Sequence, residues 1–250
     1  MKKVLLTILG MGVLALGTAR TAEAAALLNM SDSLGTQSCN TSLAFTLTNC
    51  GAGFTAVAGG NNISFTGTVG GYTMLISATT GSQPGNPTTA SVQLTDFNVV
   101  HATASSNLTI DFGGSGFFLP TNPMFLSASQ TGNWTSSTTG DQANLTGYGQ
   151  PGANLVIGGT AAVSPPCIVG GTTTTSCSTS SPDVLFTRGT ADYTLLGRVI
   201  ITQAVGDGPA LYTSTVAVTP GPVPEPATIL LFGAGLFGLA SRARKLKKQV

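Results

Sequence analysis

Apolar and polar residues alternate with a period of two along much of the chain. Ile63 and Phe65, for example, are separated and flanked by Asn62, Ser64 and Thr66. Successive side chains of a β-strand point to opposite faces, so this pattern predicts strands with one buried face. The predicted strands cover residues 43–48, 62–66, 72–78, 92–99, 107–112, 192–204 and 211–218.

Glycine and proline separate these runs, as at Gly70-Gly71, Gly113-Gly114 and Pro151-Gly152. Many short strands divided by such turn signals are typical of an all-β sandwich or barrel. Between residues 27 and 222 no run has the helical period. We therefore expect one all-β, antiparallel domain that is sandwich-like or jelly-roll-like.

Two details refine the predicted strands. The alternation that begins at Val92 changes phase at Asp96, which predicts a β-bulge or the end of a strand. The run from Tyr72 to Ala78 contains more apolar residues than simple alternation allows, and we expect it to be buried more fully.

The N-terminus has the three parts of a secretory signal peptide. Lys2 and Lys3 precede an apolar run from Val4 to Leu16, and Ala22-Glu23-Ala24 fits an A-x-A cleavage site. The sequence therefore predicts a helical signal peptide over residues 1–24 and export by the Sec route.

The C-terminus combines a tripeptide, an apolar run and a basic cluster. Pro224-Glu225-Pro226 is followed by the uncharged run Ala227–Ala240. A run of this length is short for a bilayer core of about 30 Å, but the stems of basic residues can extend it. The basic residues that should stay on the cytoplasmic side are Arg242, Arg244, Lys245, Lys247 and Lys248. We expect a transmembrane helix and tail over residues 227–250, with everything before Pro224 outside.

This order of elements closely resembles the PEP-CTERM sorting signal of Gram-negative bacteria. The resemblance covers about the last 27 residues of the 250-residue chain. It implies that Pro224, Glu225 and Pro226 are recognised by an exosortase, a membrane-embedded transpeptidase that removes the tail. It also implies release to the cell surface or extracellular matrix after an intermediate in the inner membrane. Members of this family often occur with exopolysaccharide and biofilm systems.

The predicted division of the chain has four parts. A secreted β-rich domain over residues 25–218 follows the signal peptide, and a proline-rich linker with the tripeptide covers residues 219–226. The sorting helix and tail then occupy residues 227–250. We expect the domain to lie on the periplasmic side first and at the cell surface or outside the cell afterwards.

Charge changes once both end segments are set aside. Arg188 and Arg198 are the only basic residues between them, against seven aspartates, which gives a formal charge near −5. Nucleic-acid phosphates need a basic surface, so this balance argues against a nucleic-acid partner. It argues equally against electrostatic attachment to anionic lipid.

The four cysteines form two local pairs. Cys39 and Cys50 are 11 residues apart, and Cys167 and Cys177 are 10 apart. Outside the cytoplasm disulfides are the default, and proximity favours these two pairings among the three that are open. A zinc site is disfavoured because the spacings do not fit one and the chain has a single histidine. We predict no metal and no cofactor.

Catalytic residues are sparse. His101 is the single histidine; Ser105 and Ser106 lie close in sequence, but no G-x-S-x-G turn surrounds them. We expect His101 to be a surface residue at a strand end. A glycosidase would need two aspartates, because the domain has no glutamate. The pairs that could converge on neighbouring strands are Asp96 with Asp111 and Asp183 with Asp192, although solvated aspartates are the favoured interpretation.

Two features could bind a ligand. Threonines two residues apart occur at Thr46/Thr48, Thr66/Thr68 and Thr213/Thr215. A flat array of such pairs could order water or bind to an ice surface. Without a repeat in the sequence, an ordinary hydroxyl-rich surface is favoured. Trp134, the single tryptophan, could stack on a sugar ring if it were exposed, but a core position is favoured.

These observations lead to one expected function and two alternatives. We expect a non-enzymatic protein of the cell surface or extracellular matrix, sorted by an exosortase and associated with exopolysaccharide or biofilm. The first alternative is a carbohydrate- or surface-binding module, including an ice-binding-like one. The second is a secreted hydrolase that uses paired aspartates.

Overall fold

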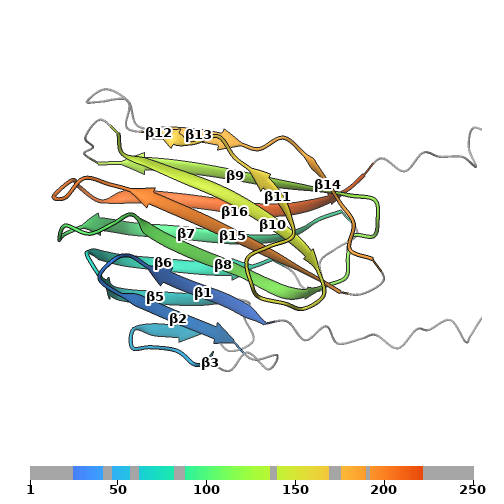
Figure 1. Cartoon of the computed structure of the whole chain (residues 1–250), viewed down its shortest axis with the longest axis horizontal. Coiled ribbons are helices and arrows are strands. Elements are labelled where there is room, and N and C mark those ends of the chain that lie inside the picture. Colours follow the sequence, from blue (N-terminus) through green and yellow to red (C-terminus); the bar gives the residue numbers. More distant parts are fainter. Residues whose placement is uncertain are drawn as a thin grey trace, which may run out of the picture.

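The computed structural model describes seven segments of the chain, residues 25–41, 47–56, 62–81, 88–135, 140–168, 176–189 and 192–221. These segments fold into two antiparallel β-sheets that share one hydrophobic core (Figure 1). The all-β prediction and its antiparallel sandwich are confirmed. The predicted signal peptide, the tripeptide, the transmembrane helix and the basic cluster lie outside the described residues. No described segment is a helix that could cross a membrane.

The first sheet, called sheet A here, has eight strands in the order β11-β10-β15-β8-β1-β2-β3, with β12 paired to β10. Their bounds are Ala26–Ser31 (β1), Thr36–Thr41 (β2), Leu47–Thr48 (β3), Leu108–Phe117 (β8), Gln142–Pro151 (β10), Thr160–Val163 (β11), Cys167–Ile168 (β12) and Tyr193–Thr202 (β15).

The second sheet, sheet B, also has eight strands, in the order β13-β9-β16-β7-β6-β5-β4, with β14 paired to β9. Their bounds are Phe54–Ala56 (β4), Asn62–Val69 (β5), Tyr72–Thr80 (β6), Ala90–His101 (β7), Met124–Trp134 (β9), Ser176–Ser180 (β13), Val184–Phe186 (β14) and Ala210–Pro220 (β16). The last strand thus includes the first two residues of the predicted linker.

Side chains that alternate in the sequence meet between the sheets. Ile63 and Phe65 of sheet B and Ile110 and Phe112 of sheet A are buried, while their polar neighbours face outward. Burial of apolar surface is the main favourable contribution to folding, so this shared core holds the two sheets together. The prediction for residues 72–78 is partly wrong, because this strand alternates as well and Leu75 is 42% exposed.

The change of phase at Asp96 is a β-bulge in the middle of a strand. On the β6 side, Leu75 is opposite Asn98 while the next residue, Ile76, is opposite Asp96. The register with β16 shifts at the same place. One extra residue reverses the faces that follow it, which is why the apolar residues after the bulge have the other parity.

Two disulfides join Cys39 to Cys50 and Cys167 to Cys177, the pairs favoured by proximity. The second one links β12 of sheet A to β13 of sheet B and so closes one edge of the sandwich. Beside it Gln130 of β9 donates from Nε2 to the carbonyl oxygens of Ala143 in β10 and of Pro165, each at 3.1 Å. The edge strand β13 is therefore attached to both sheets.

Replacing Cys167 and Cys177 by alanine together is expected to lower the free energy of unfolding by about 3 kcal/mol, because the bond closes a short loop in the unfolded chain. Urea denaturation of the purified full chain measures the change. A variant without Cys39 and Cys50 is the control, because it should lose a similar free energy while leaving the β13 edge closed. An unchanged urea midpoint after loss of the Cys167–Cys177 bond would show that this disulfide does not stabilise the domain.

Candidate functional site

The outer face of sheet B carries a continuous row of hydroxyl groups across seven strands. Directly opposite residues of paired strands share a face, so the register places the row without ambiguity. From β13 to β4 it runs through Ser178, Thr131, Thr213, Thr95, Ser77, Ser64 and Thr55.

A second row lies two residues further along the same strands. It runs through Ser180, Ser129, Thr215, Gln93, Thr79 and Asn62. Neighbouring strands lie about 4.8 Å apart, and residues two apart in a strand are separated by about 6.7 Å, so the two rows form a grid of polar groups. We call this grid the hydroxyl face.

Every member of the hydroxyl face is exposed or half-buried. The residues that flank its members in the sequence point the other way, so that Tyr212, Ser214 and Val216 of β16 are buried beside Thr213 and Thr215. Among the side chains that the structure describes on these strands, none that faces outward is charged. The face therefore offers hydrogen bonds without any net charge.

Hydrogen bonds within the face hold part of it in place. The Oδ1 atom of Asn62 accepts from the hydroxyls of Ser64 at 3.1 Å and Ser77 at 2.9 Å. Its Nδ2 atom donates to Thr79 Oγ1 at 3.3 Å. Groups already oriented in the free protein lose less conformational entropy when a ligand binds.

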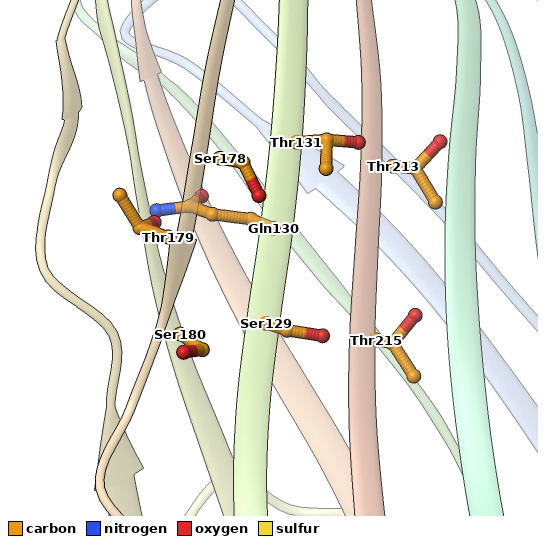
Figure 2. Close-up of a pocket in the computed structure, with 8 residues that line it drawn as sticks. All are labelled: Ser129, Gln130, Thr131, Ser178, Thr179, Ser180, Thr213 and Thr215. Carbon is orange, nitrogen blue, oxygen red and sulfur yellow. The ribbon is translucent and has the colours of Figure 1, made fainter.

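The face is hollowed along β9. Figure 2 shows Ser178, Thr131 and Thr213 side by side in one row and Ser180, Ser129 and Thr215 in the next. Short side chains leave a shallow depression of about 240 Å³ here. A neighbouring depression of about 430 Å³ is lined by Thr131, Asn133 and Leu211, among others. Together they form a trough that follows β9.

A hydroxyl group can both donate and accept a hydrogen bond, and an amide side chain offers both functions as well. The hydroxyl face can therefore match a ligand that itself carries many hydroxyls, in more than one register. No titratable group is needed for such contacts. The arrangement suits binding rather than proton transfer or nucleophilic attack.

This face was not predicted from the sequence, because the threonine pairs are scattered along the chain without a repeat. Thr66 lies on β5, and Thr213 and Thr215 lie on β16, three strands away in the same sheet. Thr46 lies outside the described residues. The signal that was available is the polar, uncharged character of every second residue in each predicted strand, but the order of the strands could not be read from it.

Trp134 is not exposed, so the hypothesis that it stacks on a sugar ring is wrong. The side chain is 1% exposed, and its ring contacts Tyr212 edge-on at 5.1 Å between centroids. As the last residue of β9 with inward parity, it fills the space between the sheets, where burial of a large aromatic surface is favourable. The core position that the sequence favoured is the one observed.

His101 lies at a strand end as predicted, but it is buried and not a surface residue. Its ring is 5% exposed and stacks on Tyr72 at 4.2 Å. Nδ1 donates to the carbonyl oxygen of Gln203 at 2.5 Å, and Nε2 lies 3.1 Å from Ser105 Oγ. The structure thus places His101 beside Ser105, one of the two serines that lie close to it in the sequence.

Hydrogen bonds to the nearby Asp32 carboxylate hold the loops around this pair together. Asp32 Oδ1 accepts from the backbone N–H groups of Leu34 and Gly35, and Oδ2 accepts from that of Gly71. Burial alone would raise the pKa of Asp32, but these hydrogen bonds and one from Ser105 outweigh it and lower the pKa. The charged carboxylate thereby joins the β1–β2 and β5–β6 turns to the loop after β7.

The pairing of Asp96 with Asp111 on neighbouring strands is also wrong. Asp96 lies on β7 of sheet B and Asp111 on β8 of sheet A. Consecutive strands lie in different sheets here because the chain crosses from one layer to the other between them. Asp111 instead forms an ion pair with Arg198, 2.7 Å between Oδ1 and Nε.

Comparison with known families concerns the segment that follows β16. Residues 222–245 match the family description "PEP-CTERM protein-sorting motif". The chain carries a PEP-CTERM sorting motif. This motif implies export and sorting by an exosortase, as expected from the tripeptide, the apolar run and the basic cluster. The PEP-CTERM motif begins one residue after Gly221, whose N–H donates to the carbonyl oxygen of Pro123 at the end of sheet B.

Comparisons of the whole chain add little. No curated protein matches it. The K3 cleaved adhesin domain of Lys-gingipain from Porphyromonas gingivalis is 8% identical, with a TM-score of 0.29, over 52% of this chain and 74% of that chain. A carbohydrate-binding module with specific mannan recognition is 12% identical, with a TM-score of 0.29, over 57% of this chain and 83% of the module.

A chain of infectious bursal disease virus, Gx strain, is 12% identical, with a TM-score of 0.31, over 83% of this chain and 54% of that chain. Likenesses this weak say nothing about function. The function of the domain that precedes the PEP-CTERM motif is therefore argued from its own residues.

Proposed function

We propose that this chain is a non-enzymatic protein of the cell surface or extracellular matrix of a Gram-negative bacterium, which binds neutral exopolysaccharide through the hydroxyl face. In this proposal the protein is exported by the Sec route, waits in the inner membrane with its domain on the periplasmic side, and is released there by an exosortase. The observation that carries the binding role is the pair of uncharged polar rows across sheet B.

A polymer suits such a face better than a small ligand does. One hydrogen bond typically contributes a net free energy of only about 0.5–1.5 kcal/mol. A single sugar unit would therefore bind weakly to an exposed face. A polysaccharide repeats the same hydroxyls along its length and can contact many grid positions at once, which raises the overall affinity. The trough along β9, lined by Ser129 and Thr131, offers such a chain a path.

The uncharged character of the face supports a neutral polymer in particular. An acidic polysaccharide would find no cation on the hydroxyl face and would meet a domain whose formal charge is near −5. Like charges repel at a distance and slow association. A neutral polymer meets no such barrier.

Sheet geometry favours a polymer over an ice surface. Adjacent strands of a sheet are rotated by about 20–25° relative to each other, so a row that crosses six or seven strands turns with the sheet. A flexible chain can follow such a surface, whereas a crystal plane cannot. The ice-binding alternative is therefore the less well supported ligand for the same face.

Replacing Thr131 and Thr213 by glutamate is expected to weaken binding to neutral polysaccharide by at least about tenfold, or about 1.4 kcal/mol. Two long, charged side chains would interrupt the first row at its second and third positions and displace the polymer. The measurement is co-sedimentation of the purified full chain with cellulose, chitin and exopolysaccharide from the producing bacterium. Thr109→Glu is the matched control, because Thr109 is half-buried on the outer face of sheet A.

Three outcomes would overturn the proposal. The wild-type chain could fail to bind all three polymers, or the Thr109→Glu control could lose as much binding as the double variant. Inhibition of ice recrystallisation by the wild type, lost in the double variant, would replace the polymer by ice as the ligand.

A further inference from the structure

A further polar row, separate from the two rows of the hydroxyl face, crosses the outer face of sheet A. Arg198 of β15 is opposite Asp111 of β8, Asp111 is opposite Asn29 of β1, and Asn29 is opposite Ser38 of β2. These four residues line a groove of about 530 Å³. Ligand sites for small molecules typically measure about 300–1,000 Å³, so the groove has the size of one.

The wall of the groove comes from the loop between β10 and β11, which Figure 1 shows in front of sheet A. Leu155, Val156 and Ile157 of this loop face Arg198 and Asp111 across the groove. The Gln150 side-chain amide donates to the carbonyl oxygens of Asn154 and Val156 and holds the loop in this position. A polar floor is thus combined with an apolar wall.

The charges on the floor cancel. Arg198 donates from Nε and Nη2 to the two carboxylate oxygens of Asp111, at 2.7 and 2.9 Å. The hydrogen bond to Asp111 raises the pKa of Arg198 above its ordinary value, which keeps the guanidinium charged. Each carboxylate oxygen retains a further lone pair, and Nη1 has no partner among the described residues. The pair can therefore both accept from and donate to a ligand.

Asn29 supplies the observation that points to a ligand. Its Oδ1 atom is buried and has no hydrogen-bond partner among the described residues. A buried polar atom without a partner is uncommon in folded proteins, because its desolvation is not compensated. Asn29 lines the groove beside the ion pair. Its amide would have to turn towards the groove for a hydroxyl group of a bound molecule to reach the buried Oδ1 atom.

We propose that this groove, called the sheet A groove, binds one neutral sugar unit through two adjacent ring hydroxyls. One hydroxyl donates to the Asp111 carboxylate and accepts from Nη1 of Arg198, and the next donates to Asn29 Oδ1. The apolar C–H face of the ring packs against Val156 and its neighbours in the loop. A neutral ligand fits because the floor has no net charge to offer.

This inference rests on the proposed function only for the class of ligand. The groove of about 530 Å³ is bordered by the loop residues Leu155, Val156 and Ile157, whereas the hydroxyl face runs across the strands of sheet B. The two sites lie on the outer faces of different sheets, so one variant need not affect both. A protein with both could join two polysaccharide chains.

The experiment uses saturation-transfer NMR and calorimetry on the purified full chain with glucose, galactose and mannose, and with glucuronate as the charged comparison. We expect a neutral sugar to bind with a dissociation constant on the order of 1 mM. Asn29→Leu should weaken it by at least about tenfold. The thermal midpoint should not fall, because Oδ1 makes no hydrogen bond that the variant could lose. Val156→Asp should weaken binding too, because a charged side chain would replace part of the apolar wall. Folding should not be disturbed, since Val156 is 63% exposed and lies outside the core.

Asn144→Leu is the matched control, because Asn144 is half-buried on the same face of sheet A but does not line the groove. The inference is overturned if no neutral sugar binds, if only glucuronate binds, or if Asn29→Leu keeps the affinity of the wild type. The variant with Thr131→Glu and Thr213→Glu should retain its affinity for the soluble sugar. Loss of polymer binding in that variant therefore tests the hydroxyl face alone.

Discussion

A chain in which Pro224, Glu225 and Pro226 are all replaced by alanine is expected to stay in the membrane fraction, with release to the medium reduced by at least about tenfold. The PEP-CTERM motif implies processing by an exosortase, and we propose that the exosortase recognises this tripeptide. From the sequence we expect the two prolines to favour an extended backbone, because the proline ring fixes φ and disfavours a helical residue before it. Glu225 is also the single charged residue between Asp207 and Arg242.

Cell fractionation followed by mass spectrometry of the released protein measures this effect. Glu225→Gln, which keeps the shape and removes the charge, separates the two contributions. Deletion of the exosortase in the producing bacterium should give the same retention as the triple variant. Normal release of the triple variant, or an unchanged size and location without the exosortase, would refute sorting through this tripeptide.

Replacing Phe112 by alanine is expected to lower the free energy of unfolding by about 3–5 kcal/mol. Phe112 is 0% exposed, in the middle of sheet A, opposite Leu28 on one side and Gly197 on the other. Its loss would leave a cavity between the sheets that neighbouring strands can fill only in part. A domain is stable by about 5–15 kcal/mol in total, so this one change would remove a large share.

The neighbour of Phe112 allows a sharper test. A Cβ atom at Gly197 would lie 2.3 Å from Cζ of the Phe112 ring, so Gly197→Ala alone should cost about 1–3 kcal/mol through overpacking. In the Phe112→Ala background the methyl group has room and the cost should nearly disappear. The two substitutions should therefore be coupled by at least about 1 kcal/mol in a double-mutant cycle.

Urea denaturation of the purified full chain, followed by fluorescence of the buried Trp134, gives these free energies. Leu75→Ala is the control, because Leu75 is 42% exposed and its truncation should have a small effect. Additive costs for Phe112→Ala and Gly197→Ala would show that the ring does not occupy the space above Gly197.

Parts of this fold follow from short-range patterns. The period-two alternation around Ile63 and Leu108 predicts strands and their buried faces, and the change of phase at Asp96 predicts the bulge. Each of these inferences needs only a few consecutive residues, since a strand's faces are set by its own backbone. The disulfide between Cys167 and Cys177 follows from proximity along the chain in the same way.

The burial of particular residues was less predictable. His101 was expected at the surface, but its environment depends on Gln203, which is far away in the sequence. For Trp134 the sequence favoured a core position, but it did not show that the partner would be Tyr212. Asp111 became part of an ion pair because β15, which carries Arg198, inserts next to β8. Patterns local to Asp111 contain no information about that partner.

By itself, the sequence determined that the chain carries a PEP-CTERM sorting motif, which implies export, and that its domain is built of β-strands. The PEP-CTERM motif is one continuous segment of the sequence. Alternation within a single strand is enough to predict which of its faces is polar and points outward. Only the tertiary structure decided that Ser178, Thr131 and Thr213 form one row and that Asn29 lies beside Asp111. The reason is physical: strand order and register arise from long-range pairing between segments, and the two surfaces proposed to bind sugars exist only after that pairing.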